Sequence, residues 1–260
     1  LETHVVKDLN LYVFERLENE RVFHSRENKF YLCNEPISAL SANSGSKNFV
    51  EEISYLDESE WFSYADENDI NTREELFFNF NSSELSKNES LGLVVNFRQT
   101  LMTTYLIYSA LDYMGDMAGE ILAEYGRKKN TKKELSGIYN LLGGIDIYVW
   151  NESKNSWIQQ GSFYETGPIA RNLQILPFKD LTPVNGEEVK IKIELTKGLW
   201  RLDFLGLTNI IKEVSPVILE PVSVTYLKPQ NESFLNDLND KSREILSMPG
   251  DEYKFDFTLP

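Results

Sequence analysis

The chain has 260 residues, of which 41% are hydrophobic, and this is enough for a large packed core. Its 26 basic and 41 acidic residues give a formal net charge of −15. Nucleic acids and anionic membrane surfaces are therefore excluded as expected partners, because both would repel the protein. The single cysteine, Cys33, excludes an internal disulfide, and its strand-like setting predicts a small buried hydrophobe.

Strands are predicted for most of the first hundred residues. The first three runs are expected to form a meander, and the segment rich in Ser, Asn and Gly at residues 41–47 is predicted to be a loop. The segment 49–56 fits either a helix or a strand. The predicted strands are residues 9–15, 21–25, 29–34, 61–64, 75–80 and 91–97.

A long helix is predicted from Thr100 to Tyr125, where apolar residues recur at helical spacing until Gly126 ends the pattern. This segment contains three acidic residues, so we expect a soluble helix and no transmembrane segment in this chain. A second, short helix is expected at residues 131–142. The basic run 127–133 is interpreted as a solvated helix end, with a phosphate, an anionic glycan or an acidic partner as the alternative ligand.

The second half of the chain is predicted to return to strands, at residues 145–150, 156–163, 172–176 and 217–227. Residues 188–207 contain two apolar/polar alternations joined at Lys197-Gly198, which predicts an antiparallel hairpin. Its core face is expected to include Trp200, Leu202 and Phe204. Residues 234–246 predict a short C-terminal helix, and Tyr253, Phe255 and Phe257 predict a final strand.

The predicted fold class is therefore mainly β: an antiparallel, jelly-roll-like β-sandwich with an inserted long helix and a short C-terminal helix. We expect residues 1–260 to form a single composite unit. The alternative is an N-terminal β domain at residues 1–96 followed by a β-sandwich with inserted helices at residues 97–260.

Motifs for catalysis or metal binding are weak. The only histidines, His4 and His24, lie in no metal or triad pattern. The acidic loop Asp66 to Asn71 begins like a calcium loop but lacks the required glycine and the final Glu, which favours a solvated loop and leaves calcium open. Arg201 and Asp203 are expected to form an ion pair on one strand face. We predict no catalytic residues, no metal site and no cofactor.

Aromatic residues provide the best candidate for a binding site. In the run from Ile145 to Trp150, alternation places Ile145, Ile147 and Val149 on one face and Asp146, Tyr148 and Trp150 on the other. An exposed indole can stack on a sugar ring, whereas core packing is the competing interpretation. The predicted ligand-binding residues are Tyr148, Trp150, Trp157, Tyr164 and Arg171.

The strands at 145–150 and 157–163, the Gln174-Ile175-Leu176-Pro177 segment and the strand at 199–207 together resemble galactose-binding-like jelly-roll β-sandwich modules. The long helix that follows residues 91–98 resembles a feature of uncharacterised bacterial surface proteins and lipoproteins. The resemblance covers roughly residues 91–207 and is a resemblance in sequence pattern. It implies a secreted or cell-surface β-sandwich that is used for binding.

The sequence is therefore consistent with three functions. The leading hypothesis is a noncatalytic secreted or cell-surface module that recognises a glycan or a protein partner. The alternatives are a structural or assembly subunit of a surface or secretion-related complex, and a carboxylate-based hydrolase. The chain begins at Leu1, and the sequence leaves open whether a signal peptide or a lipid anchor preceded it. It also leaves open the ligand and the oligomeric state.

Overall fold

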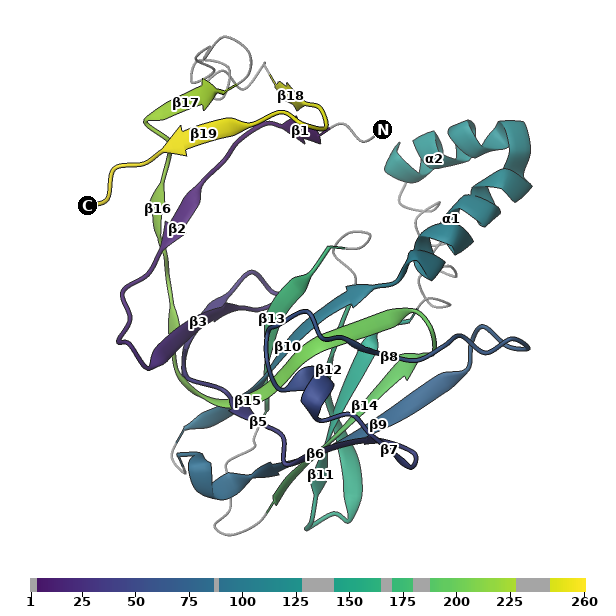
Figure 1. Ribbon diagram of the computed structural model, residues 1–260, viewed down its shortest axis with the longest axis vertical. Helices are drawn as coiled ribbons and strands as arrows, with labels where there is room; N and C mark the ends of the chain where they lie inside the picture. The colour runs from purple at the N-terminus through teal and green to yellow at the C-terminus, as the bar shows by residue number, and fades with distance from the viewer. Residues whose placement is uncertain (1–3, 87–88, 128–142, 165–169, 180–187, 228–243) are drawn as a thin grey trace. The chain divides into compact units, whose positions relative to one another are not determined.

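The computed structural model describes residues 4–86, 89–127, 143–164, 170–179, 188–227 and 244–260 (Figure 1). The chain falls into two compact units. Unit 1 comprises residues 1–17 and 214–260, and unit 2 comprises residues 18–213. The predictions of one composite domain, or of a boundary near Asn96, stay predictions.

Unit 1 joins the beginning of the chain to its end by antiparallel strand pairs. The pairs are β1 (His4–Val6) with β18 (Ile245–Ser247), β2 (Leu11–Val13) with β16 (Val217–Leu219), and β17 (Ser223–Tyr226) with β19 (Tyr253–Asp256). Val224 and Ile245 form its buried centre. The predicted opening meander is only partly correct: β2 pairs with β16 instead of with the next strand of the chain, whereas β3 (Glu20–His24) and β4 (Phe30–Asn34) pair as an antiparallel hairpin.

The C-terminal predictions have mixed outcomes in this unit. The final strand is confirmed as β19. Most of the predicted helix at 234–246 lies outside the described residues, but its last part, Ile245 and Leu246, belongs to strand β18. These two residues therefore contribute to a strand pair in place of a helix face.

Unit 2 contains two large sheets, and the protein is mainly β, as predicted. The six-stranded sheet has the order β12 (Ser156–Phe163), β11 (Ile145–Asn151), β14 (Glu188–Thr196), β9 (Arg73–Asn81), β6 (Ser41–Ser44) and β7 (Lys47–Asn48). The seven-stranded sheet has the order β10 (Ser90–Gln99), β13 (Asn172–Pro177), β3 (Glu20–His24), β4 (Phe30–Asn34), β15 (Trp200–Val214) and β5 (Ile37–Ser38), with β8 (Trp61–Phe62) also paired to β15. The predicted loop at 41–47 is wrong, because it forms β6 and β7.

The two sheets share one hydrophobic core. The six-stranded sheet contributes alternate residues such as Phe78, Ile147 and Ile193, and the seven-stranded sheet contributes residues such as Leu93 and Leu205. All five are fully or almost fully buried. Since each such side chain stabilises the fold by roughly 1.5–3 kcal/mol, this core is the main reason why the strands of unit 2 stay together.

Five strands of the larger sheet close on themselves. The order β10-β13-β3-β4-β15 is completed by pairing of β15 with β10, which makes a small barrel. A second core lies among these strands and contains Phe23, Cys33, Val94, Ile175 and Ile210. The prediction for Cys33 is confirmed: the thiol is buried, and burial raises its pKa to about 12.

The predicted hairpin at 188–207 is wrong in its pairing, although both of its strands exist. Strand β14 pairs with β11 and β9, whereas β15 pairs with β10, β8 and β5 in the other sheet. The Lys197-Gly198 turn therefore carries the chain from one sheet to the other. Alternation shows which residues face a core, but it contains no information on which strand lies alongside.

A β-bulge also changes the predicted faces of β15. Asn96 pairs with Phe204, but Phe97 pairs with Leu202, so Asp203 is the extra residue. Trp200 and Leu202 lie in the core between the sheets as predicted, whereas Phe204 packs against the barrel core. The predicted Arg201–Asp203 ion pair is wrong, because Arg201 binds Glu60 at 3.1 Å and Asp203 accepts a hydrogen bond from Asn96.

Helices are few in the described chain. The predicted helix at 100–125 is divided into α1 (Leu101–Met114), a 3₁₀ turn η3 (Gly115–Met117) and α2 (Ala118–Arg127). The break is at Gly115, whose φ of +56° an L side chain rarely adopts. Two further 3₁₀ turns are η1 (Glu51–Ile53) and η2 (Ser82–Glu84).

The remaining helix predictions are only partly tested. Gly126 lies within α2, and the predicted helix at 131–142 and the basic residues after Arg127 lie outside the described residues. Within the part of the chain that the structure describes, none of the helices combines the length and the apolar character that a membrane crossing requires.

Candidate functional site

The outward face of the six-stranded sheet carries three of the five residues predicted to bind ligand. In β11, Ile145, Ile147 and Val149 are buried in the core between the sheets, and Tyr148 and Trp150 therefore point to the other side. This division of faces is the predicted one. The β11–β12 register places Trp157 directly opposite Trp150, so both indoles lie on the outward face.

These indoles form the centre of an aromatic cluster, which we call the aromatic platform: Phe77, Tyr148, Trp150 and Trp157. The rings of Trp150 and Trp157 meet edge to face, with centroids 5.3 Å apart and an angle of 67°. The Phe77 ring, from β9, lies 5.9 Å from that of Trp157. Both tryptophans are half-buried, so part of each ring is in contact with solvent.

A lysine lies beneath the platform. The ammonium group of Lys192, in β14, is 4.7 Å from the centroid of the Tyr148 ring and 5.9 Å from that of Trp157. Only 8% of the residue is exposed. Two carboxylates neutralise it: Glu75 binds at 2.8 Å, and Glu194 is a second ion-pair partner. The cation and the aromatic rings therefore form one packed group.

The ion pairs control the ionisation of this group. Burial would lower the pKa of Lys192, but the hydrogen bonds to Glu194 and Glu75 outweigh it, and the pKa lies above its ordinary value. Burial would raise the pKa of Glu194, but the bonds from Lys192 and Tyr148 outweigh it, and the pKa is lowered. Burial raises the pKa of the Tyr148 hydroxyl. At neutral pH Lys192 is therefore an ammonium, Glu194 a carboxylate and Tyr148 a neutral phenol.

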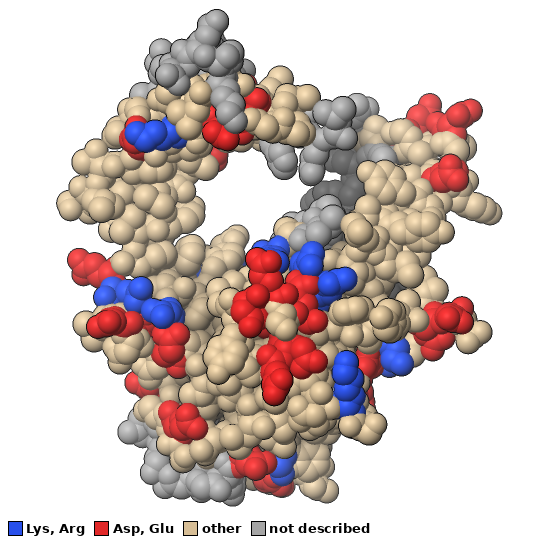
Figure 2. Space-filling view, viewed as in Figure 1, with Lys and Arg blue, Asp and Glu red and all other residues tan. Residues whose placement is uncertain are grey.

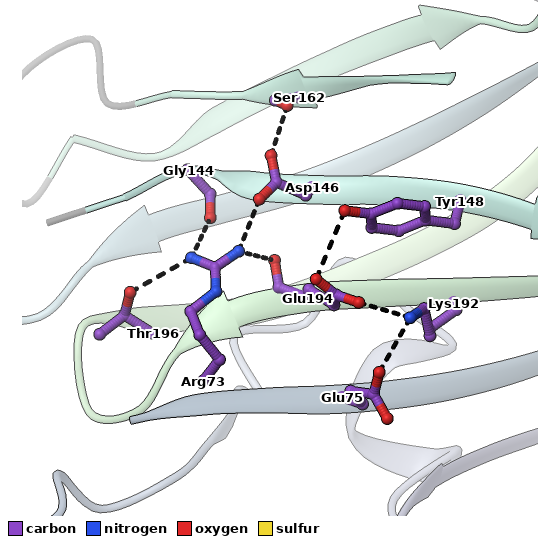
Figure 3. Close-up of polar contacts among 9 residues, drawn as sticks. All are labelled: Arg73, Glu75, Gly144, Asp146, Tyr148, Ser162, Lys192, Glu194 and Thr196. Carbon is purple, nitrogen blue, oxygen red and sulfur yellow. Dashed lines mark hydrogen bonds and ion pairs between the residues drawn. The ribbon is translucent and has the colours of Figure 1, made fainter. Parts of the chain in front are cut away.

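Arg73 connects the strands on the same face, as Figure 3 shows. Its Nη2 donates to the Asp146 carboxylate at 2.6 Å and to the Glu194 carbonyl at 3.1 Å. Its Nη1 donates to the Gly144 carbonyl at 3.4 Å and to the Thr196 hydroxyl at 3.3 Å. Three strands, β9, β11 and β14, are held by this one guanidinium, so it gives the platform a fixed base.

A small hollow of about 220 Å³ borders the platform at Trp150. Its other lining residues include Lys154, Gln159, Gln160 and Lys179, which present ammonium and amide groups. Glu152 lies beside it: its carboxylate accepts hydrogen bonds from Trp150 and Lys190, and these lower its pKa. An aromatic ring with charged and amide groups around it is suited to a hydroxyl-rich ligand.

Tyr164 and Arg171 do not join this group. Tyr164 packs under Arg26, whose guanidinium carbon is 4.1 Å from the ring centroid. Arg171 forms an ion pair with Glu58 at 2.7 Å. Tyr164 follows the end of β12 opposite to Trp157, roughly 20 Å along an extended strand. The structure therefore brings together Tyr148, Trp150 and Trp157 but not the other two.

Sequence reasoning missed Phe77, Glu75, Arg73 and Lys192. Alternation in their strands could have placed them on an outward face, but it could not show that β9 and β14 lie beside β11. The expectation of a hairpin between β14 and β15 directed attention to the wrong neighbour. The pairing of Tyr148 with Lys192, and of Lys192 with Phe77, is visible only in the sheet register.

The other candidate sites, for metal binding and for histidine chemistry, have less support in the described residues. No group of three metal-ligating side chains occurs in the part of the chain that the structure describes. In the acidic loop, the Asp66 carboxylate accepts hydrogen bonds from the backbone of Asn68 and Asp69 and from the hydroxyl of Thr72. His24 is a strand residue next to Asn28 and Phe30. The acidic loop therefore binds its own backbone.

Comparison with known proteins adds no relationship. No protein-family model matches the chain, and no curated protein matches it. A function for this protein therefore has to rest on the chemistry of the aromatic platform and of the surfaces around it.

Proposed function

We propose that this is a noncatalytic binding protein, secreted or on a cell surface, whose aromatic platform contacts a glycan. The observation that carries the proposal is the half-buried Trp150–Trp157 pair, which is edge to face and bordered by a polar hollow. A sugar ring has an apolar C–H face that stacks on an indole and hydroxyls that bind amides and charged groups.

The rigidity of the platform supports binding. Because Arg73 and Lys192 are held by carboxylates from neighbouring strands, the rings above them need little further ordering when a ligand arrives. The proposal includes the resemblance of this chain to galactose-binding-like modules. Two facing sheets with a common core are compatible with such a sandwich, and the closed five-stranded barrel is a feature of this chain.

A glycan array probed with the protein tests the proposal. The best ligand is then titrated to measure its affinity. We expect Trp150→Ala to weaken binding at least about ten-fold, which corresponds to the loss of one aromatic contact. Trp157→Phe keeps a ring and is expected to retain most of the affinity. Tyr113→Ala is the matched control, because this side chain is 95% exposed on α1. Binding that survives Trp150→Ala in a folded protein would exclude the platform.

An assembly subunit is the second candidate, and α1 favours it. Among its exposed side chains are Leu101, Tyr105, Tyr108 and Tyr113. Such a helix is suited to a protein interface. Light scattering of the chain and of a Tyr105→Ser, Tyr108→Ser variant distinguishes the two functions: self-association that the variant abolishes favours assembly, whereas a monomer that still binds a glycan favours the platform.

A further inference from the structure

A second hollow lies in unit 2, away from the six-stranded sheet that carries the platform. It has a volume of about 560 Å³, which is within the range of small-molecule sites. It lies where β8, the end of β10, the start of α1 and the start of β15 meet. We call it the arginine hollow and define it by Phe62, Tyr64, Arg98, Leu101, Met102 and Arg201.

The floor of the arginine hollow is cationic. Arg98 and Arg201 line it, and no Asp or Glu is among its described lining residues, although the chain has 41 of them. Both guanidiniums bind Glu60: Arg98 through Nε at 2.5 Å and Nη2 at 2.6 Å, and Arg201 through Nη1 at 3.1 Å. The three groups together carry one net positive charge.

Donor groups remain on this floor. In the described part of the chain, the Nη1 of Arg98 and the Nε and Nη2 of Arg201 make no hydrogen bond, because the contacts of each guanidinium use only the side toward Glu60. The Arg201 guanidinium also lies 4.6 Å above the Phe62 ring, which fixes its plane. A fixed guanidinium with free N–H groups is suited to an oxyanion.

The walls of the hollow are apolar and accessible. Tyr64 is 84% exposed and Leu101 is 67% exposed, and Phe62 and Met102 are also exposed. In a chain with a net charge of −15, a hollow lined by two arginines and by no Asp or Glu among its described lining residues is a local exception. Figure 2 shows that basic side chains on the visible face lie against acidic ones.

We propose that the arginine hollow binds a small organic monoanion, a carboxylate attached to an apolar group. The carboxylate is placed on the free N–H groups of Arg98 and Arg201, and the apolar group lies against Phe62, Tyr64 and Met102. One net positive charge matches a carboxylate better than a phosphate dianion. The site uses β8, β10, α1 and β15, and it is independent of the platform.

Titrations of the chain with defined probes, followed by ligand-observed NMR, test this site. The probes are N-acetylphenylalanine, which mimics a peptide C-terminus, hexanoate, which mimics a fatty acid, and N-acetylphenylalanine amide. We expect both acids to bind and the amide to bind at least about ten-fold more weakly, because a charge-assisted pair is lost. The tighter acid identifies the natural source. Equal binding of the acid and its amide would overturn the proposal.

Two variants locate the binding. Arg201→Gln is expected to weaken acid binding at least about ten-fold. Since this change also removes a partner of Glu60, Leu101→Asp is the second variant: it places a negative charge at the rim, where an acidic residue in the first turn of a helix favours folding. Arg21→Gln is the matched control, because Arg21 is also paired with a Glu, at 3.1 Å from Glu35, but does not line the hollow. Acid binding that is unchanged in folded Leu101→Asp protein would exclude the hollow.

Discussion

The side-chain amide of Asn96 donates a 2.8 Å hydrogen bond to the carboxylate of Asp203, at the point where the pairing of β10 with β15 shifts by one residue. Both residues are buried. The other carboxylate oxygen of Asp203 accepts a 2.9 Å bond from the backbone N–H of Glu58. The extra residue of the bulge therefore satisfies two donors, one in its own sheet and one in the segment before β8.

Replacing Asp203 by Ala leaves these two donors without their acceptor. We expect the free energy of unfolding to fall by about 2–3 kcal/mol, measured by urea denaturation, because unsatisfied buried polar groups are costly. Asp57→Ala is the control: Asp57 is exposed, its carboxylate accepts one bond from Ser59, and the expected loss is below about 1 kcal/mol. Equal losses for the two variants would contradict this role of Asp203.

Gly198→Ala tests the crossing between the sheets. Gly198 has a φ of +76°, and a Cβ there would lie 2.6 Å from the backbone of Ala65. We expect a loss of at least about 2 kcal/mol, since backbone strain and a steric clash add. Gly45→Ala separates the two causes, because Gly45 has a φ of +56° but nothing within 4 Å of a Cβ. A thermal melting curve in which both variants lose the same stability would show that the contact with Ala65 is unimportant.

The buried ion pairs of Glu60 predict how the stability of the protein depends on pH. Its side chain is 6% exposed; burial alone would raise its pKa, but hydrogen bonds from Arg98 and Arg201 outweigh this and the pKa is lowered. The stabilisation is complete above the unfolded pKa of about 4.3 and is lost as the pH falls through the lower folded pKa. Glu60→Gln is therefore expected to cost about 3 kcal/mol at pH 7 and to reduce the loss of stability on acidification.

The matched control for Glu60 is Glu213→Gln. Glu213 binds Lys29 at 2.7 Å, and both side chains are about half exposed. An exposed pair contributes less than about 1 kcal/mol, so the control is expected to remain close to the parent protein in urea denaturation at pH 7. If the two variants behave alike, the buried position of Glu60 has no energetic consequence.

Much of the site followed from local pattern. Alternation placed Tyr148 and Trp150 on the face opposite Ile147, because successive side chains of a strand point to opposite sides whatever the strand pairs with. Segment 156–163 was predicted with the bounds that the structure shows, but the position of Trp157 opposite Trp150 is given by the strand register. Tyr164 and Arg171 lie outside the platform, because nearness in sequence does not measure distance in the fold, and their contact with a ligand stays a prediction.

By itself, the sequence determined a mainly β protein, the positions of most long strands and the outward face of β11, since these depend on a period of two residues. Only the tertiary structure decided that β14 and β15 belong to different sheets, that Lys192 lies beneath the aromatic rings, and that Arg98 and Arg201 meet at Glu60. The ion pairs of Lys192 with Glu75 and of Glu60 with Arg98 and Arg201 join residues 38 to 141 positions apart. Which residues become partners depends on the packing of whole sheets. The local periodicity of the sequence carries no information on these partners.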